Sequence, residues 1–292
     1  KGCEIVDPHF PESEVLPFDI TPKEQQMMDE AIEAAKPAEV VIMVLGGSEV
    51  TVREERSRTS LVLPGRQEEL LKAVCKLGKP TILGMIDGRA SSINYAKKYV
   101  PAILHAWFPG EFCGQAVAET IFGDNNPGGR LAVTFPKSVG QIPFAFPFKP
   151  GSDSGCGTSV TGALFPFGHG LSYTTFEYSN LRISPEQQGV LGEVKVSCTV
   201  KNTGKRIGDE VVQLYLRDEI SSVTTYVKIL RGFERITLQP NEEKEVIFTL
   251  SPQDLAIWDK NMKFQVEPGT FKVMIGASSK DIKLEGKFTI NK

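Results

Sequence analysis

The sequence has few of the residues that build metal sites and disulfide frameworks. Its 292 residues include three histidines and five cysteines. No CxxC pair or cysteine–histidine cluster suggests a metal site. No metal or organic cofactor is implied. The cysteines are scattered and odd in number, which leaves a single disulfide open without deciding it. They are Cys3, Cys75, Cys113, Cys156 and Cys198.

The chain also lacks long apolar runs and a strong charge. Its longest apolar run, residues 40–45, is far too short to cross a bilayer. The formal net charge of -3 does not suggest nucleic acid or an anionic membrane as the partner. The first residues, KGCE, form neither a signal peptide nor an initiator methionine, so we expect a processed or excised piece. What is present, 40% apolar and 24% charged residues, is typical of a soluble globular protein long enough for two domains.

The first part of the chain alternates strand-like and helical patterns. Residues 39–46 (EVVIMVLG) are almost continuously apolar, which predicts a strand buried on both faces of a parallel sheet. Residues 67–77 carry apolar side chains at helical spacing, and Gly78 fits the end of that helix. Further strands are predicted at 81–86, 102–108 and 130–135, further helices at 22–35 and 111–122, and a turn at 124–129. Such alternation predicts an α/β open-sheet sandwich domain with helices on the faces of its sheet.

The helical signal disappears after Tyr173, and short alternating strands replace it. Residues 194–200 (VKVSCTV) alternate strictly, so Cys198 is predicted to be a buried small hydrophobe. Several such strands over about 120 residues predict an all-β fibronectin type III-like sandwich. We therefore divide the chain into an α/β domain at 1–144, whose start we expect to be missing, a linker or loop at 145–172, and the fibronectin-like domain at 173–292.

The loop after the first strong strand is rich in charge. Residues 49–58 (EVTVREERSR) hold three glutamates and three arginines. Loops at the carboxyl ends of parallel strands are where α/β folds bind ligands. The alternative is a solvated loop with pairwise ion pairs. The preceding Gly46-Gly47-Ser48 fits neither glycine-rich phosphate-binding pattern, which argues against a nucleotide.

Four further segments carry a resemblance. They are WFPGE at 107–111, FGDNNPGGRL at 122–131, FPFGHGLSYT at 165–174 and VKNTGKRIGDEVVQLY at 200–215. Together, and in this order, they resemble the glycoside hydrolases of family 3, nearest to the β-glucosidase and β-xylosidase branch. The resemblance implies a (β/α)8 barrel that supplies an aspartate nucleophile, an α/β domain that supplies a glutamate as general acid/base, and a fibronectin-like domain. We expect only the latter two here, and no nucleophile can be carried over onto this chain.

The resemblance also implies where the acid lies. The family's glutamate follows a valine-rich strand, four residues before an arginine, with a leucine-rich segment ending in Leu-Pro downstream. Glu54 stands four residues before Arg58, and residues 61–64 (LVLP) supply the downstream segment. Glu54 is therefore the predicted acid, with Glu55 and Glu49 as rivals. We expect the neighbouring arginines to point away from Glu54 or to pair with these rivals, because direct contact would lower its pKa.

A few other side chains are candidates for binding. Trp107 could stack on a sugar face, with core packing as the alternative. Arg58 is a second candidate substrate-binding residue. Asp87 and Arg89 follow a strand and are either groups at the rim of the site or members of a turn. Trp258 is expected to pack in a core or between domains.

These features predict the C-terminal part of a retaining exo-β-glycosidase that is β-glucosidase-like and hydrolyses terminal non-reducing β-D-glycosyl residues. Its partners would be a β-linked oligosaccharide or glycoside and the missing barrel of the same protein, in the periplasm or outside the cell. The piece alone should be inactive, because one carboxylate cannot run double displacement. The alternative is a non-catalytic module that binds carbohydrate or protein.

Overall fold

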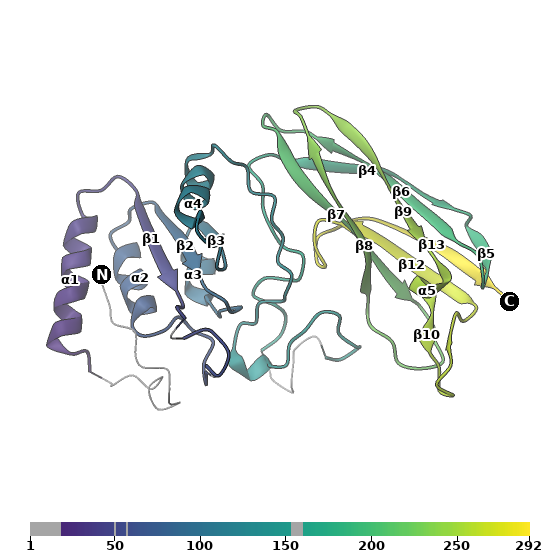
Figure 1. Cartoon of the computed structure of the whole chain (residues 1–292), viewed down its shortest axis with the longest axis horizontal. Coiled ribbons are helices and arrows are strands. Elements are labelled where there is room, and N and C mark those ends of the chain that lie inside the picture. Colours follow the sequence, from purple (N-terminus) through teal and green to yellow (C-terminus); the bar gives the residue numbers. More distant parts are fainter. Residues whose placement is uncertain (1–18, 50, 57, 153–159) are drawn as a thin grey trace. The chain divides into compact units, whose positions relative to one another are not determined.

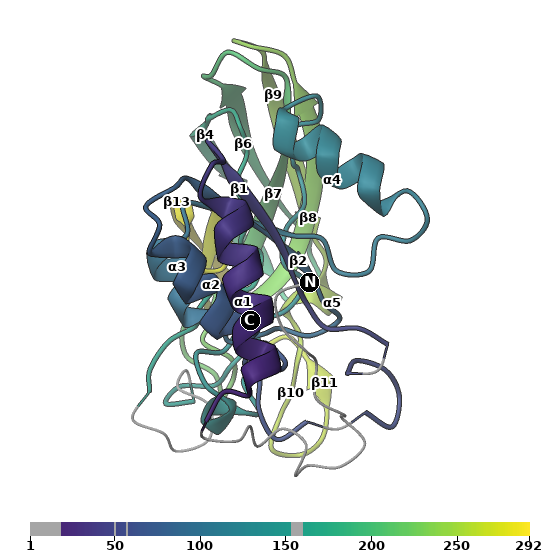
Figure 2. The same cartoon turned by 90° about the vertical axis from the view of Figure 1, so that its left-hand side faces the viewer.

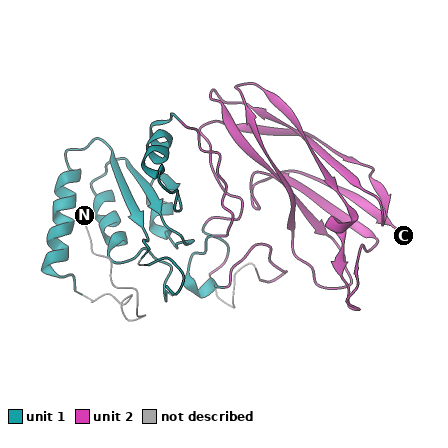
Figure 3. Cartoon of the chain, viewed as in Figure 1, with its two compact units in different colours: residues 1–124, 135–142, 162–164 teal, residues 125–134, 143–161, 165–292 magenta. Residues whose placement is uncertain are grey.

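The computed structural model describes residues 19–49, 51–56, 58–152 and 160–292, which fall into two compact units (Figure 3). The first unit takes residues 1–124, 135–142 and 162–164, and the second takes 125–134, 143–161 and 165–292. The boundaries predicted from sequence remain a prediction. The compact units differ from them chiefly because residues 125–134 cluster with the second unit.

The first unit is an α/β domain around a parallel sheet of order β1-β2-β3 (Figure 1). Figure 2 shows α2 and α3 on the opposite side of the strands from α4. The strands are β1 (Val41–Gly46), β2 (Thr81–Ile86) and β3 (Ala102–His105). The helices are α1 (Pro22–Ala35), α2 (Gln67–Cys75), α3 (Asn94–Tyr99), α4 (Cys113–Phe122) and the 3-10 turn η2 (Val139–Gln141).

Capping and one buried ion-pair cluster fix the first helices. Thr21 and Glu24 form a reciprocal capping box at the start of α1. The buried guanidinium of Arg66 then binds Glu24 at 3.0 Å and Glu69 at 2.9 Å. Because Glu24 lies in α1 and Glu69 in α2, this cluster ties the two helices together.

One face of strand β1 is open in the described residues. Leu83 and Met85 on β2 are fully buried, but Ile42 and Val44 on β1 are 44% and 61% exposed. The prediction that this strand is buried on both faces is therefore wrong. Since β1 is the edge strand of the described sheet, its alternate side chains lack a covering layer there. On α4, Phe122 is exposed as well.

Three elements differ from the sequence prediction. The strand expected at 102–108 ends at His105, since Trp107 has a φ of 55° that no strand accommodates. Residues 130–135 form no strand, because their backbone pairs only at separate points. Leu131 N–H donates to the His169 carbonyl at 2.9 Å, and Leu164 N–H donates to the Phe135 carbonyl at 2.8 Å. The short helix α3 was not predicted.

The second unit is the predicted fibronectin type III-like sandwich. Its five-stranded sheet has the order β5-β13-β12-β7-β8, and its three-stranded sheet has the order β4-β6-β9. The elements are β4 (Phe176–Ser184), β5 (Gln187–Gly189), β6 (Val194–Asn202), β7 (Gly208–Asp218), β8 (Ile229–Leu238), β9 (Glu243–Leu250), α5 (Pro252–Leu255), β10 (Ile257–Trp258), β11 (Phe264–Gln265), β12 (Gly269–Gly276) and β13 (Ile282–Asn291). Alternate residues of β6 are buried, as strict alternation predicts.

Two side-chain predictions in this part of the chain have opposite outcomes. Cys198 is buried in the sandwich core as a free thiol, as predicted, and Cys75 and Cys113 are free as well. Cys3 and Cys156 lie outside the described residues. Trp258 is 59% exposed on the short β10–β11 ladder, where it contacts Phe264, so the core alternative is wrong and packing between domains stays a prediction.

Residues 125–134 are held in the second unit by a buried charge network. The Arg130 guanidinium binds the Glu210 carboxylate at 2.9 Å, and the Tyr178 hydroxyl donates to the other carboxylate oxygen at 2.9 Å. Glu210 lies on β7 and Tyr178 on β4, so this network also links the two sheets. No helix in the part of the chain that the structure describes is long and apolar enough to span a membrane.

Candidate functional site

The candidate site lies at the carboxyl edge of the parallel sheet, where three loops begin. The first loop starts at Gly46, whose φ of +136° and close approach to β2 admit only glycine, since a Cβ would lie 2.1 Å from the Ile86 carbonyl oxygen. The buried Gln67 amide then binds Gly46 twice, accepting from its N–H at 2.7 Å and donating to its carbonyl at 2.8 Å. The point where this loop leaves the sheet is therefore fixed.

Glu54 is exposed on a short turn of this loop, residues 51–56, which we call the acid turn. The turn begins at buried Thr51, whose hydroxyl accepts from the Ser48 N–H at 2.8 Å. It is closed by a bond from the Arg56 N–H to the Arg53 carbonyl at 3.1 Å. Within the described residues, no hydrogen bond or ion pair engages the Glu54 carboxylate. The carboxylate thus stands in solvent on a structured turn.

One arginine of the loop binds a backbone oxygen. Arg58, a predicted substrate-binding residue, donates to the Val62 carbonyl at 3.1 Å. Within the described residues, neither Glu49 nor Glu55 forms an ion pair with an arginine of the loop. From the sequence we expect the arginines either to point away from Glu54 or to pair with Glu49 and Glu55. Arg58 follows the first alternative, because it binds the Val62 carbonyl.

The second loop, residues 87–91, is a tight turn after β2. Asp87 is fully buried and accepts from the Ser91 hydroxyl at 2.5 Å and from the Arg89 N–H at 3.2 Å. The Arg89 guanidinium donates to the Arg56 carbonyl in the acid turn. Of the two sequence alternatives for Asp87 and Arg89, these contacts are those of a turn, and they connect it to the first loop.

Aromatic side chains line the third loop after β3. The His105 ring lies 4.4 Å from Trp107 and 5.2 Å from Phe135, centroid to centroid. Burial lowers the pKa of His105, and the nearby Asp87 carboxylate opposes part of that shift. Trp107 is half-buried and also contacts Phe135 edge-on at 6.0 Å. Its packing is that of an aromatic cluster, and sugar stacking by Trp107 remains a prediction.

Sequence reasoning gave no role to Gln67, Gly88 or His105. Gln67 acts through a contact to Gly46, 21 positions away in the sequence. His105 lies in the segment before WFPGE, but its contact with Phe135 depends on the fold. Only the glycines offered a sequence signal, because glycine directly after a strand often marks a close backbone approach.

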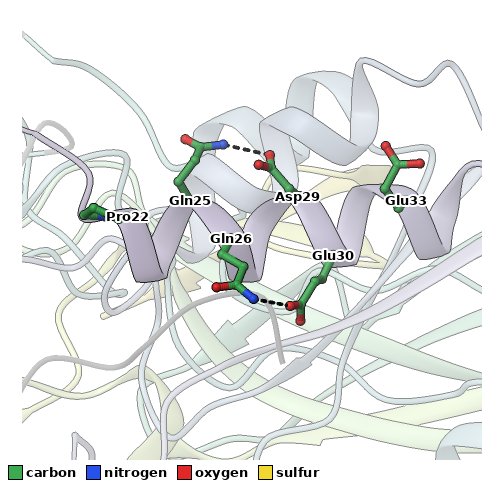
Figure 4. A pocket seen from close by; sticks show the side chains of 6 residues that line it. All are labelled: Pro22, Gln25, Gln26, Asp29, Glu30 and Glu33. Carbon is green, nitrogen blue, oxygen red and sulfur yellow. Dashed lines mark hydrogen bonds between the residues drawn. The ribbon is translucent and has the colours of Figure 1, made fainter.

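Two other kinds of site find no support. Among the described residues, no group of His, Cys, Asp and Glu side chains could hold a metal ion. An open depression runs along the exposed face of α1, shown in Figure 4. Its side chains pair along the helix, with Gln25 bonded to Asp29 at 2.8 Å and Gln26 to Glu30 at 2.9 Å. Those amides and carboxylates are thus partly satisfied by one another.

Comparison with family models gives two matches. Residues 9–173 match the glycosyl hydrolase family 3 C-terminal domain. Residues 210–279 match a fibronectin type III-like domain. The two matched ranges correspond in order to the α/β unit and the sandwich.

Similar proteins are glycosidases by name. A β-xylosidase of Formosa agariphila is 47% identical over 266 residues, which cover 90% of this chain and 37% of that protein. A periplasmic β-glucosidase of Salmonella typhimurium is 42% identical and is matched over 91% of this chain and 36% of its own length. The chain therefore spans little more than a third of the length of these relatives.

Solved structures match most or all of the chain. A β-glucosidase from Erythrobacter marinus superposes with a TM-score of 0.89 at 37% identity, covering 100% of this chain and 40% of that one. A β-glucosidase from Listeria innocua in complex with glucose gives a TM-score of 0.85 at 28% identity, covering 94% of this chain and 39% of that one.

Proposed function

The chain belongs to glycosyl hydrolase family 3, and we propose that it forms the C-terminal part of a retaining exo-β-glycosidase of the β-glucosidase type. The whole protein would hydrolyse terminal non-reducing β-D-glycosyl residues, and this part would supply the general acid/base. Support comes from relatives named as β-glucosidases and β-xylosidases, which match this chain over about nine tenths of its length.

The observation that carries the proposal is the place of Glu54. Its carboxylate is exposed on the acid turn, at the edge of the parallel sheet where α/β folds bind ligands. Among the described residues, no arginine forms an ion pair with it. A carboxyl group in such surroundings can enter a sugar pocket formed by another part of the protein and become partly desolvated there.

The chemistry needs two carboxyl groups with different roles. In the first step a nucleophilic carboxylate attacks the anomeric carbon while Glu54 donates its proton to the departing glycosidic oxygen. In the second step Glu54, now ionised, removes a proton from the water that releases the sugar. Retaining enzymes hold the two groups about 5–5.5 Å apart. The nucleophile would come from the proposed barrel, which this chain does not include.

The surroundings of the site fit a larger protein. The open face at Ile42 and Val44 presents apolar side chains that the rest of the protein could cover. We place the protein in the periplasm or outside the cell, with the Salmonella relative's name as support. Trp107 and Arg58 are proposed to contact the substrate. The chain by itself should not hydrolyse glycosides.

The test is Glu54→Gln in the full-length protein, with Glu55→Gln and Glu49→Gln as matched controls. General acid catalysis contributes about 10²–10⁴-fold to the rate. The rate of alkyl glycoside hydrolysis should therefore decrease by a factor in that range. Aryl glycosides with acidic phenols need little protonation and should form the glycosyl-enzyme at nearly the normal rate. Azide, which needs no general base, should restore turnover of the variant on those substrates.

The outcomes separate the candidates. If only Glu54→Gln slows the hydrolysis of alkyl glycosides while the glycosyl-enzyme still forms at nearly the normal rate from aryl glycosides, the acid/base assignment is supported. We call this pattern selective loss. The same loss in Glu55→Gln or Glu49→Gln would move the assignment to that residue. Unchanged turnover of both substrate types in all three variants leaves the chain without an acid, and the non-catalytic binding module would then be the better description.

A further inference from the structure

We propose that the loop after β2 is the positioning device of the acid turn, with Gly88 seating Val52 and Arg89 holding Arg56. The inference rests on the proposed function, since it concerns how the Glu54 carboxylate is placed. Neither Gly88 nor Arg89 needs to touch the substrate for this role. Both would act through the backbone of residues 51–56.

The first attachment lies two residues before the acid. Val52 packs directly against two glycines, because a Cβ at Gly88 would lie 2.5 Å from Val52 Cγ1 and a Cβ at Gly47 would lie 2.5 Å from Val52 Cγ2. The same Cβ at Gly88 would also meet the Phe108 ring at 2.7 Å. Real Cβ contacts are never this short, so any side chain at Gly88 must displace Val52, Phe108 or the loop itself.

The second attachment lies two residues after the acid. Arg89 donates to the carbonyl of Arg56, and its own backbone N–H is bonded to the buried Asp87 carboxylate. Asp87 in turn accepts from the Ser91 hydroxyl. The turn after β2 is therefore held by its own hydrogen bonds to Asp87. The Arg89 side chain then links this turn to the acid turn through the Arg56 carbonyl.

These two attachments explain how an exposed carboxylate can be placed accurately. The Glu54 side chain is exposed and has no hydrogen-bond or ion-pair partner among the described residues, so the backbone largely sets its position. That backbone is held on both sides by one rigid turn, with Glu55 at a φ of 62° between them. A misplacement of about 1 Å at a catalytic group can reduce rate by about 10²-fold.

The test compares Gly88→Ala with Gly114→Ala in the full-length protein. Neither glycine has a left-handed φ, so alanine is allowed by the backbone at both, but a Cβ at Gly114 in α4 meets nothing within 4 Å. We expect Gly88→Ala to lower kcat/KM about 10–100-fold for alkyl glycosides and less than about threefold for activated aryl glycosides. Gly114→Ala should leave both rates unchanged.

Arg89 provides the second measurement, in case Gly88→Ala fails to fold. Arg89→Met should show the same selective loss for poor leaving groups and faster hydrogen exchange of the amides at 51–56. Arg89→Lys should recover part of the rate, because an ammonium group can still donate to the Arg56 carbonyl.

The results distinguish this inference from the proposed function. If Glu54→Gln shows selective loss while Gly88→Ala and Arg89→Met slow both substrate types equally or slow neither, the positioning role is overturned and the acid assignment stands. If Glu54→Gln slows neither substrate type, the proposed function itself fails. Selective loss in all three variants supports both.

Discussion

Replacing Arg130 by methionine is expected to destabilise the sandwich unit strongly at neutral pH. Arg130→Met keeps an apolar stem of similar length but leaves the Glu210 carboxylate without its cation. The side chains of Arg130 and Glu210 are 7% and 4% exposed, so water cannot solvate the unpaired Glu210 carboxylate unless the fold opens. Removing one partner of a buried pair costs about 3–5 kcal/mol, and we expect a loss in this range.

The destabilisation caused by Arg130→Met should depend on pH in a defined direction. Burial already raises the pKa of Glu210, while Arg130 and Tyr178 counteract it. Without Arg130 the pKa of Glu210 rises further. Protonation of Glu210 at acid pH then removes the unpaired buried charge, and the variant loses less stability there. A group with a raised folded-state pKa contributes stability below its ordinary value of 4.5 and loses that contribution as pH rises. The difference between variant and parent should therefore be larger at pH 7 than at pH 5.

Urea unfolding of the chain measures the loss. The chain has two tryptophans, and Trp107 belongs to the first unit while Trp258 belongs to the second. A Trp107→Phe background therefore makes fluorescence report the sandwich unit, which matters because two units need not unfold together. Adding Glu210→Gln to Arg130→Met removes the unpaired charge and should return most of the lost stability.

An exposed ion pair in the same unit serves as the control. Arg235 binds Asp209, but its side chain is 60% exposed. Arg235→Met should cost less than about 1 kcal/mol. A cost below about 1 kcal/mol for Arg130→Met at pH 7, or an equal cost at pH 5, would refute the buried-charge argument.

Two further outcomes follow from buried polar groups. Burial raises the pKa of Asp218 to about 6, so its contribution is complete below the ordinary value of 3.8 and is lost as pH rises toward 6. After allowance for its partial exposure, Asp218→Asn should stabilise the chain by about 1 kcal/mol at pH 7 and by almost nothing at pH 4, in urea titrations at both values. Gln67→Leu removes both bonds to Gly46 and should cost about 2–3 kcal/mol, whereas Gln25→Leu on the exposed face of α1 should change the free energy of unfolding by under about 0.5 kcal/mol.

Local patterns predicted the elements with strong caps or strict periodicity. The bounds of α1 and β2 agree residue for residue, because a capping box and a short apolar run between turn signals are local features. Helix α3 was missed, since its six residues lack a side-chain cap. The open face of β1 and the exposure of Trp258 were missed for another reason. Burial depends on what packs against an element, and an apolar run does not contain that information.

The candidate site divides in the same way. Glu54 was predicted as the acid from the family resemblance, which rests on its distance to Arg58 and on the strand before it, and both of these are local in the sequence. The contact between Arg89 and Arg56 joins residues 33 positions apart, and no spacing rule connects them. Likewise Arg130 was placed in a predicted strand, because its partner Glu210 lies 80 positions away. Motif spacing can name a reactive group, but the groups that hold it belong to neighbouring loops.

An acid that serves a sugar bound elsewhere faces two opposing requirements. Its carboxyl group must be free to meet the glycosidic oxygen, and the Glu54 carboxylate has no hydrogen-bond partner among the described residues. It must also be placed accurately, because proton transfer requires about 2.6–3.2 Å between the heavy atoms. The two requirements are compatible only if the backbone on either side is fixed. In the proposed mechanism the attachments at Val52 and Arg56 fix this backbone, so a single methyl group at Gly88 tests the mechanism without changing the acid itself.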